Sequence, residues 1–458
     1  MSRPAPAPFH TLRIHSSPLA TLHFSTSPPN SILYAGDQDG WISVLDLRVR
    51  RVVAFWKGHE GGVLGIGEWE GGLISHGRDN VVHFYEPLKR PYIPIPTSTT
   101  PDPKLYKPSI RRSLPTNALN FCRFSLASIP AHTVINVDKG KGKQKEAVMA
   151  VPSLADSELV DIYHIPSFQR LHASINFSSK PPQVPSNVDL PGASRTGLVM
   201  SLHLFHAPIN LSAGEEERNL GLAIAYEDGR LELFSAVLSS LDTPYDAKMT
   251  VHNSTTNGAN QNPWKLRWNG KGHNEAIMAS AVDSRGRRGW SVSADHRLVR
   301  YEFDQVWERK CEKDDVKVIK PYATKQIGNS SIAISADDKV VAVGGWDGKI
   351  RLFSAATSKP LGTLSSHRET VHALAFAHLP SSPSHSISSD DTETSTEAET
   401  ATETTTEYPE STVDLGDDDD SDVDEEVDGI PPRERWLASG GKDGKVALWG
   451  LIDFNASG

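Results

Sequence analysis

The chain has 458 residues, 38% of them apolar, and a formal net charge of −10. Its two cysteines, Cys122 and Cys311, exclude a disulfide framework and favour a reducing compartment. No apolar run approaches the roughly twenty residues that span a membrane, and Met1–Pro8 lacks the apolar core of a signal peptide. These features predict a protein of the nucleus or the cytosol that makes no membrane contact.

Residues 9–15 come first in chain order, where alternating side chains predict a short strand that ends at His15. A second strand is expected at Leu19–Phe24. From there one pattern recurs seven times: an apolar run, an aspartate turn, and an alternating strand that ends in an apolar or aromatic residue. Asp-Gly between two such runs is a strong hairpin signal. The turn aspartates are Asp39, Asp79, Asp156, Asp228, Asp295, Asp347 and Asp443.

Histidines separate these hairpins at regular intervals. His59 lies twenty residues after Asp39 and twenty before Asp79. A unit of about forty residues with four strands is typical of the WD-repeat blade of a β-propeller. Seven units predict an all-β fold, a single seven-bladed propeller over residues 1–458. The last strand, Lys445–Trp449, has no fourth strand after it, so we expect residues 9–15 to complete that blade and close the ring.

The turn aspartates predict a buried network. An aspartate at the bend can accept hydrogen bonds from its own turn and from the histidine before the first strand of the blade, and a serine and a third-strand aromatic can extend the chain. We interpret such groups as locking the blade, not as catalytic. The complete pairs are His59–Asp79, His273–Asp295 and His367–Asp443, with Trp449 as the aromatic of the last blade.

Catalytic motifs are missing from the sequence. It contains neither a phosphate-binding Gly-x-x-x-x-Gly-Lys-Ser/Thr loop nor a Gly-x-Ser-x-Gly elbow, and its cysteines are too few for a typical zinc site. We therefore expect no catalytic residue, no cofactor and no metal. The alternative is an enzyme built from scattered residues around the channel, which would need turnover by the purified chain alone.

Seven units need roughly 280–300 residues, so the remaining residues predict solvated insertions. One of them contains a basic run, Lys139–Lys145, which is either a nuclear-localisation or nucleic-acid patch or a plain solvated loop. No aromatic residue interleaves with it, so direct nucleic-acid binding is not expected. The insertions are expected at residues 87–115, 131–147, 178–196, 207–219, 236–263 and 378–432.

The largest insertion, residues 378–432, is acidic. It holds eighteen carboxylates from Asp390 to Asp428, and no Lys or Arg occurs from Leu379 to Pro432. With few apolar residues to offset the entropy of ordering, it is expected to be disordered and dispensable for folding. Three roles stay open: a solubilising loop, a dock for basic partners such as histone tails, or an internal mimic that competes for the basic face. Ser381–Ser395 adds candidate phosphorylation sites.

Several segments of this sequence resemble the ASTRA-associated protein 1 family of fungi, which is related to the animal G-protein β-subunit-like proteins. The resemblance covers nearly the whole propeller but not the insertions, and two of the segments, Asn117–Cys122 and Val151–Pro166, are not general WD-repeat signals. The segments are Leu33–Trp41, His76–Asn80, Asn117–Cys122, Val151–Pro166 and Ser439–Trp449.

The resemblance implies a non-catalytic scaffold subunit of the ASTRA complex, involved in chromatin remodelling and in chaperone-assisted maturation of phosphatidylinositol-3-kinase-related kinases. The implied partners are the other subunits, including RuvB-like AAA+ ATPases and kinase-maturation co-chaperones. The implied location is the nucleus and also the cytoplasm. The alternative is a generic WD-repeat adaptor, such as a ubiquitin-ligase substrate receptor or a G-protein β-like subunit. The G-protein reading is disfavoured because it needs a long N-terminal coiled-coil helix, whereas Met1–Pro8 holds three prolines.

Overall fold

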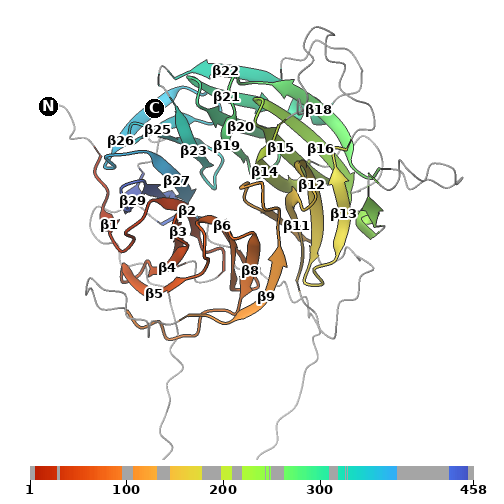
Figure 1. Ribbon diagram of the computed structural model, residues 1–458. Coiled ribbons are helices and arrows are strands. Elements are labelled where there is room, and N and C mark those ends of the chain that lie inside the picture. Colours follow the sequence, from red (N-terminus) through yellow and green to blue (C-terminus); the bar gives the residue numbers. More distant parts are fainter. Residues whose placement is uncertain are drawn as a thin grey trace, which may run out of the picture.

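Seven β-sheets stand around a central axis in the computed structural model (Figure 1). The predicted all-β, seven-bladed propeller is therefore confirmed. The structure describes residues 6–27, 31–94, 107–130, 145–177, 197–208, 219–242, 244–246, 248, 262–308, 318–324, 326, 328–378 and 433–451.

Each blade is a four-stranded antiparallel sheet, and the third blade carries a fifth, parallel strand. Blade 1 consists of β2 (Leu19–Phe24), β3 (Ile32–Asp37), β4 (Trp41–Asp46) and β5 (Arg51–Lys57). Blade 2 consists of β6 (Val63–Trp69), β7 (Gly72–Gly77), β8 (Val81–Tyr85) and β9 (Ile110–Pro115). Blade 3 consists of β10 (Ser125–Ile129), β11 (Glu146–Ser153), β12 (Asp156–Ile165), β13 (Arg170–Ile175) and β17 (Tyr245–Asp246). Blade 4 consists of β14 (Val199–His206), β15 (Asn219–Tyr226), β16 (Arg230–Val237) and β18 (Lys265–Lys271). Blade 5 consists of β19 (Ile277–Val282), β20 (Arg288–Ser293), β21 (Arg297–Glu302) and β22 (Ile319–Ala323).

Blades 6 and 7 complete the ring. Blade 6 consists of β23 (Asn329–Ile334), β24 (Val340–Gly345), β25 (Lys349–Ser354) and β26 (Pro360–Ser365). Blade 7 consists of β27 (Val371–Phe376), β28 (Trp436–Gly441), β29 (Val446–Gly450) and β1 (His10–Leu12). The helical segments in the described residues are η2 (Leu238–Asp242), α2 (Asp304–Trp307) and η3 (Arg433–Arg435).

The apolar core lies between neighbouring blades. The first strands, such as β2, β6 and β27, are innermost in Figure 1, and every residue of the second strands β3, β7, β24 and β28 is buried. Each of the seven apolar clusters joins one blade to the next. One of them packs Leu19 and Leu45 of blade 1 against Ala438 and Leu448 of blade 7, so the core is continuous around the ring.

Tight turns join the second and third strands of every blade, at the seven predicted positions. Gly348 shows why an Asp-Gly pair suits this turn. Its φ is +76°, and a Cβ there would lie 2.6 Å from the carbonyl oxygen of His367. A side chain at this position would be strained and would also collide with the loop before the next blade. We call the face that carries these seven turns the turn face.

The N-terminal strand closes the ring, as predicted. β1 pairs antiparallel with β29, with His10 opposite Leu448, and the Phe9 ring lies 4.7 Å from the Trp436 ring. The strand is shorter than the predicted residues 9–15. After Leu12 the chain leaves the sheet and carries His15 into blade 1, where its ring is buried.

Two predicted insertions contain structured elements. Residues 87–115 include β9, the outer strand of blade 2, in which Leu114 is the only buried residue. Residues 236–263 include the end of β16, the η2 segment and β17, which pairs with β13 because Leu238, Leu241 and Tyr245 bury apolar side chains there. β9 and β17 each carry too few buried residues to show a periodic pattern.

The other insertions fall mainly outside the described residues. Residues 131–144, 178–196, 209–218 and 379–432 are among those the structure does not describe, and the predictions for the Lys139–Lys145 run and the acidic tract stand as predictions. β11 begins at Glu146 and β15 at Asn219, so the predicted insertions 131–147 and 207–219 each extend slightly into the strand that follows. The strands on either side of the acidic insertion pair directly, since β27 and β28 are antiparallel with Phe376 opposite Leu437.

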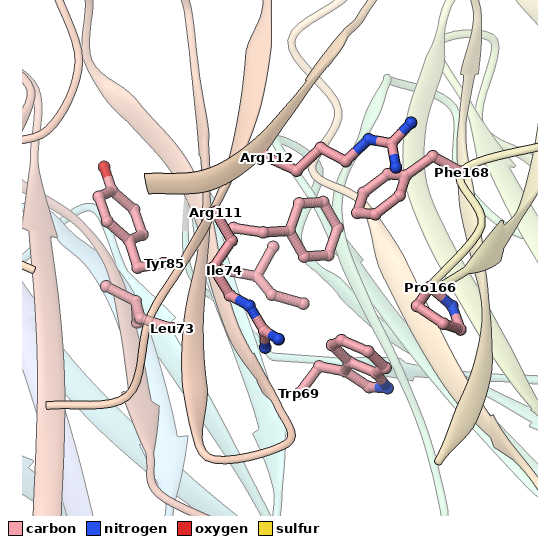
Figure 2. Close-up of a pocket in the computed structure, with 9 residues that line it drawn as sticks. Trp69, Leu73, Ile74, Tyr85, Arg111, Arg112, Pro166 and Phe168 are labelled. Atoms are coloured by element: carbon pink, nitrogen blue, oxygen red, sulfur yellow. The ribbon is translucent and has the colours of Figure 1, made fainter. Parts of the chain in front are cut away.

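Cavities among the described residues include a central and a lateral one. A central one of about 160 Å³ is lined by first-strand residues and inter-blade loops, among them Leu64, Phe121, Arg123, Met200, Met278 and His372. A lateral one of about 220 Å³ opens between blades 2 and 3 (Figure 2). No helix among the described residues is long and apolar enough to cross a membrane.

Candidate protein-binding surface and blade networks

The structure brings together each of the three predicted histidine–aspartate pairs. Blade 7 holds the most complete network. Nδ1 of His367 lies 3.0 Å from Oδ1 of Asp443, Nε2 of His367 lies 2.8 Å from Oγ of Ser439, and Nε1 of Trp449 donates to the same Oγ at 2.9 Å. One arrangement of protons satisfies every hydrogen bond of this network: the indole N–H donates to the serine oxygen, the serine O–H donates to Nε2, and the Nδ1–H donates to the carboxylate.

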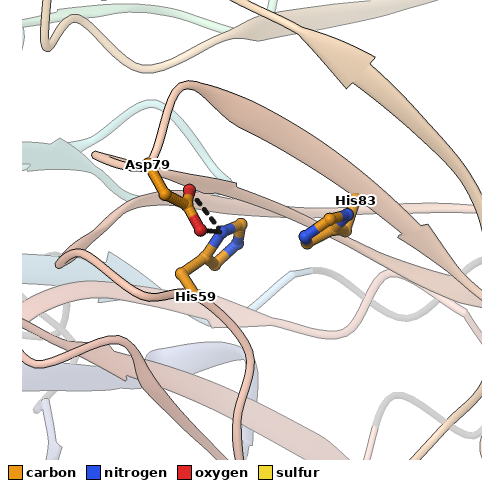
Figure 3. Close-up of side chains that lie close together, drawn as sticks. All are labelled: His59, Asp79 and His83. Atoms are coloured by element: carbon orange, nitrogen blue, oxygen red, sulfur yellow. Dashed lines mark hydrogen bonds and ion pairs between the residues drawn. The ribbon is translucent and has the colours of Figure 1, made fainter.

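Blades 2 and 5 repeat this geometry with small changes. His59 reaches Asp79 at 2.9 Å and Ser75 at 2.6 Å, and Figure 3 shows its ring facing the carboxylate. In blade 5, His273 reaches Asp295 at 2.9 Å, and the hydroxyl of Tyr301 takes the place of the indole. In all three blades the backbone N–H after the histidine also donates to the aspartate.

The pKa shifts favour a neutral histidine in blade 2 and ionised aspartates in blades 5 and 7. Burial lowers the pKa of His59, and the charge of Asp79 only partly opposes it. Burial alone would raise the pKa of Asp443, but the hydrogen bonds from His367 and from the backbone N–H groups of Lys445 and Arg368 outweigh it and leave the pKa below its ordinary value. The pKa of Asp295 is lowered in the same way by His273 against the effect of burial.

A fourth network, in blade 1, was missed. Nδ1 of His15 lies 2.8 Å from Oδ2 of Asp37, and Nε2 lies 2.8 Å from Oγ of Ser43. The carboxylate is therefore Asp37 and not the predicted turn residue Asp39, whose N–H donates to Asp37. The spacing could have revealed the pair, because His15 and Asp37 are 22 residues apart, as are His273 and Asp295.

His59, Asp79 and His83 also form a group of possible metal ligands, with ligand atoms within 4.8 Å of one another. The two imidazole rings stack at 4.9 Å with an angle of 19° (Figure 3). Both nitrogens of His59 already make hydrogen bonds, and Nδ1 of His83 lies 2.8 Å from Oγ of Ser113. A cation would have to displace these bonds, so the group is better explained as part of the blade network.

Acidification should destabilise the propeller through buried histidines. Burial is the main cause that lowers the pKa of His76 to about 4, and the charge of His59 adds to it. The unfolded chain binds this proton first, at its ordinary pKa of about 6.5. Stability from His76 is therefore complete above that pH and is lost as the pH falls toward 4. At pH 5 we expect a loss of about 2 kcal/mol.

This loss can be measured as the difference in denaturant unfolding free energy between pH 7.5 and pH 5.0. His76→Asn should reduce that difference by about 2 kcal/mol, and the remainder comes from other buried histidines such as His23 and His203, whose pKa values burial also lowers to about 4. His296→Asn, at an exposed position, should leave the difference unchanged. An equal pH dependence in all three proteins would contradict the assignment to His76.

The clearest exposed apolar surface lies on the turn face at blade 3. Leu119 is 78% exposed and Phe121 52% exposed, both in the loop that leads into β10. Leu154, in the β11–β12 turn, and Leu198, just before β14, are 50% and 37% exposed. We call these four residues the blade 3 surface. Large apolar side chains exposed on one face in this way are candidates for an interaction site.

Two asparagines hold this surface in place. Asn117 donates to the Ser153 carbonyl at 2.5 Å, and Asn120 donates to the carbonyls of Ser157 and Val199 at 2.9 and 3.0 Å. Both asparagines are buried, whereas Leu119 and Phe121 between and beside them face solvent. The two buried asparagines therefore hold the loop in one conformation while its apolar side chains remain exposed. A surface that is preorganised in this way loses less conformational entropy on binding.

Arg78 adds a charge to the blade 3 surface. Its guanidinium lies 4.9 Å from the centre of the Phe121 ring. The sequence singled out Asn117–Cys122 and Val151–Pro166 for their resemblance, but it did not reveal that Leu119 and Phe121 are exposed. That exposure depends on bonds to residues 36 to 79 positions away in the chain.

The fold and the networks define a WD-repeat β-propeller. The family described as "WD domain, G-beta repeat" matches residues 320–354 and 421–450. Over nearly its whole length the chain is similar to ASTRA-associated protein 1 of Penicillium rubens, with 28% identity over 97% of each chain. The protein of the same name from Schizosaccharomyces pombe is 26% identical over 85% of this chain and 98% of its own.

An animal protein is similar as well. Guanine nucleotide-binding protein subunit beta-like protein 1 of Mus musculus is 26% identical over 82% of this chain and 91% of its own. These similarities confirm the predicted resemblance to the ASTRA-associated protein 1 family and its animal relatives.

Proposed function

We propose that this protein is a non-catalytic scaffold subunit of an ASTRA-type assembly, acting in chromatin remodelling and in the maturation of phosphatidylinositol-3-kinase-related kinases. Similarity over almost the full length to several proteins named ASTRA-associated protein 1 carries the proposal. Its proposed partners are RuvB-like AAA+ ATPases and kinase-maturation co-chaperones, and its proposed location is the nucleus and also the cytoplasm.

The blade 3 surface supplies a physical means of assembly. Interface energy concentrates in a few aromatic and arginine anchors, and Phe121 and Arg78 supply an aromatic ring and a guanidinium with the exposed Leu119 in the same loop as Phe121. The loop of Leu119 and Phe121 belongs to one of the segments that resemble the ASTRA-associated family beyond general WD-repeat features. We therefore propose that partner subunits contact the turn face at blade 3.

Replacing Leu119 and Phe121 together by serine should lower partner recovery about tenfold or more, because each truncated anchor typically costs over 1 kcal/mol. The measurement is affinity purification of the tagged full chain with quantitative mass spectrometry. Thermal stability should change little, since both side chains are exposed.

Val49 and Ile93 give a matched control. They are 53% and 77% exposed and lie on the face opposite the turn face, so Val49→Ser with Ile93→Ser should retain the partners. Recovery of cullin adaptors or of small G-protein γ-like subunits in place of ATPases and co-chaperones would contradict the proposed assembly. Equal recovery by both double variants would contradict the blade 3 surface.

A further inference from the structure

The lateral pocket lies on the face opposite the turn face. Its walls come from the ends of β6 and β8, the starts of β7 and β9, and the β12–β13 turn of blade 3. The lining includes the apolar side chains of Leu73, Ile74 and Phe84. Figure 2 shows the Arg112 side chain beside Phe168 and the Arg111 side chain on the side of Trp69. At about 220 Å³ the cavity is below the roughly 300–1,000 Å³ of small-molecule pockets. It is suited to one bulky side chain.

One wall of the pocket is built from a strained residue. Phe168 has a φ of +62°, which is a true outlier for a bulky side chain. Its ring packs edge-on against Phe84 at 4.7 Å, and the Arg112 guanidinium lies 4.5 Å from the ring centre. Its backbone N–H donates to the His164 carbonyl at 2.7 Å. Strain of this kind persists only where the surroundings hold it, and it clusters at functional sites.

Two arginines are the charged part of the pocket lining, which is otherwise mostly apolar and aromatic. Figure 2 shows the Arg111 side chain extending toward Trp69. Nε of Arg111 lies 3.1 Å from Glu86, whereas the Arg112 guanidinium lies over the Phe168 ring, so the two arginines outnumber the one carboxylate paired here.

We propose that this pocket binds an extended acidic segment of a partner protein through one bulky apolar side chain. The apolar side chain would occupy the cavity that Leu73, Ile74 and Phe168 line, and flanking carboxylates would pair with Arg111 and Arg112. Guanidinium groups suit planar carboxylates because they can donate two parallel hydrogen bonds. The proposal deepens the scaffold function, on which it rests, by adding a second contact on the opposite face.

The test is a titration of the purified full chain with a fluorescent peptide of glutamate and serine that carries one central phenylalanine. Replacing that phenylalanine by alanine should weaken binding about tenfold, as for a buried anchor. Replacing the glutamates by glutamine should weaken it too, and added salt should weaken only the glutamate peptide. No ASTRA subunit is present, so this result is independent of the partner-recovery experiment.

Arg112→Glu should weaken binding at least tenfold. Arg285→Glu makes the same charge change at an exposed position on the same face in blade 5 and should have little effect. Phe168→Gly is a second variant that removes the wall while relieving the unfavourable φ, so lost binding cannot be ascribed to backbone strain. Melting temperatures of all variants are recorded alongside.

Several results would overturn the proposal. They are equal binding of the phenylalanine and alanine peptides, equal effects of Arg112→Glu and Arg285→Glu, or displacement of the peptide by single-stranded oligothymidylate. Binding that appears only after residues 379–432 are replaced by a short Gly/Ser turn would instead make the chain's own acidic insertion the occupant.

Discussion

Removing residues 1–12 should lower the melting temperature of the propeller by several degrees and promote aggregation. The deletion removes the three register pairs of β1 with β29 and exposes the edge of blade 7. It also removes Phe9 and Leu12, which pack on the cluster between blades 7 and 1. Lost hydrogen bonds and apolar burial together amount to about 4 kcal/mol. Differential scanning fluorimetry and light scattering measure both effects.

Deleting residues 1–5 is the matched control, because these residues precede β1 and leave His15 and its network untouched. That variant should melt like the intact chain. A propeller lacking residues 1–12 that melts at the same temperature would show that the N-terminal strand does not close the ring.

Local patterns were enough to predict the blades. An aspartate turn between alternating runs specifies a hairpin whatever surrounds it, and all seven such hairpins occur in the structure. Closure was predictable for a related reason, since a blade without a fourth strand needs one from elsewhere. β9 could not be predicted in this way, because a strand that buries only Leu114 has no periodic signal.

The sites needed information from distant parts of the chain. Asp37 and Asp39 both fit the local pattern, and only the position of His15 shows that Asp37 is the acceptor. Exposure of Leu119 follows from the bonds of Asn117 and Asn120 to the carbonyls of blades 3 and 4. The lateral pocket joins strand ends of blade 2 to a turn near Phe168, more than fifty residues further along the chain. No single segment carries the pattern of such a site.

Asp443→Ala should destabilise the protein by about 1–3 kcal/mol, the usual cost of leaving a buried partner without its hydrogen bond. The change removes the acceptor of His367 Nδ1 and of the backbone N–H groups of Arg368 and Lys445. It leaves the bonds from Trp449 to Ser439 and from Ser439 to His367 without their terminal charge. Denaturant unfolding at pH 7.5 measures the loss.

Asp347→Ala is the control at the equivalent turn of blade 6. Asp347 is 43% exposed and pairs with Arg351 at the surface, where an ion pair contributes about 0–1 kcal/mol. An equal loss in both variants would mean that the buried network does not set the stability of its blade. Recovery of partner subunits should fall only as far as the folded fraction does. A fully folded Asp443→Ala protein that no longer recovers them would show that the His367–Asp443 pair takes part in binding as well as in locking the blade.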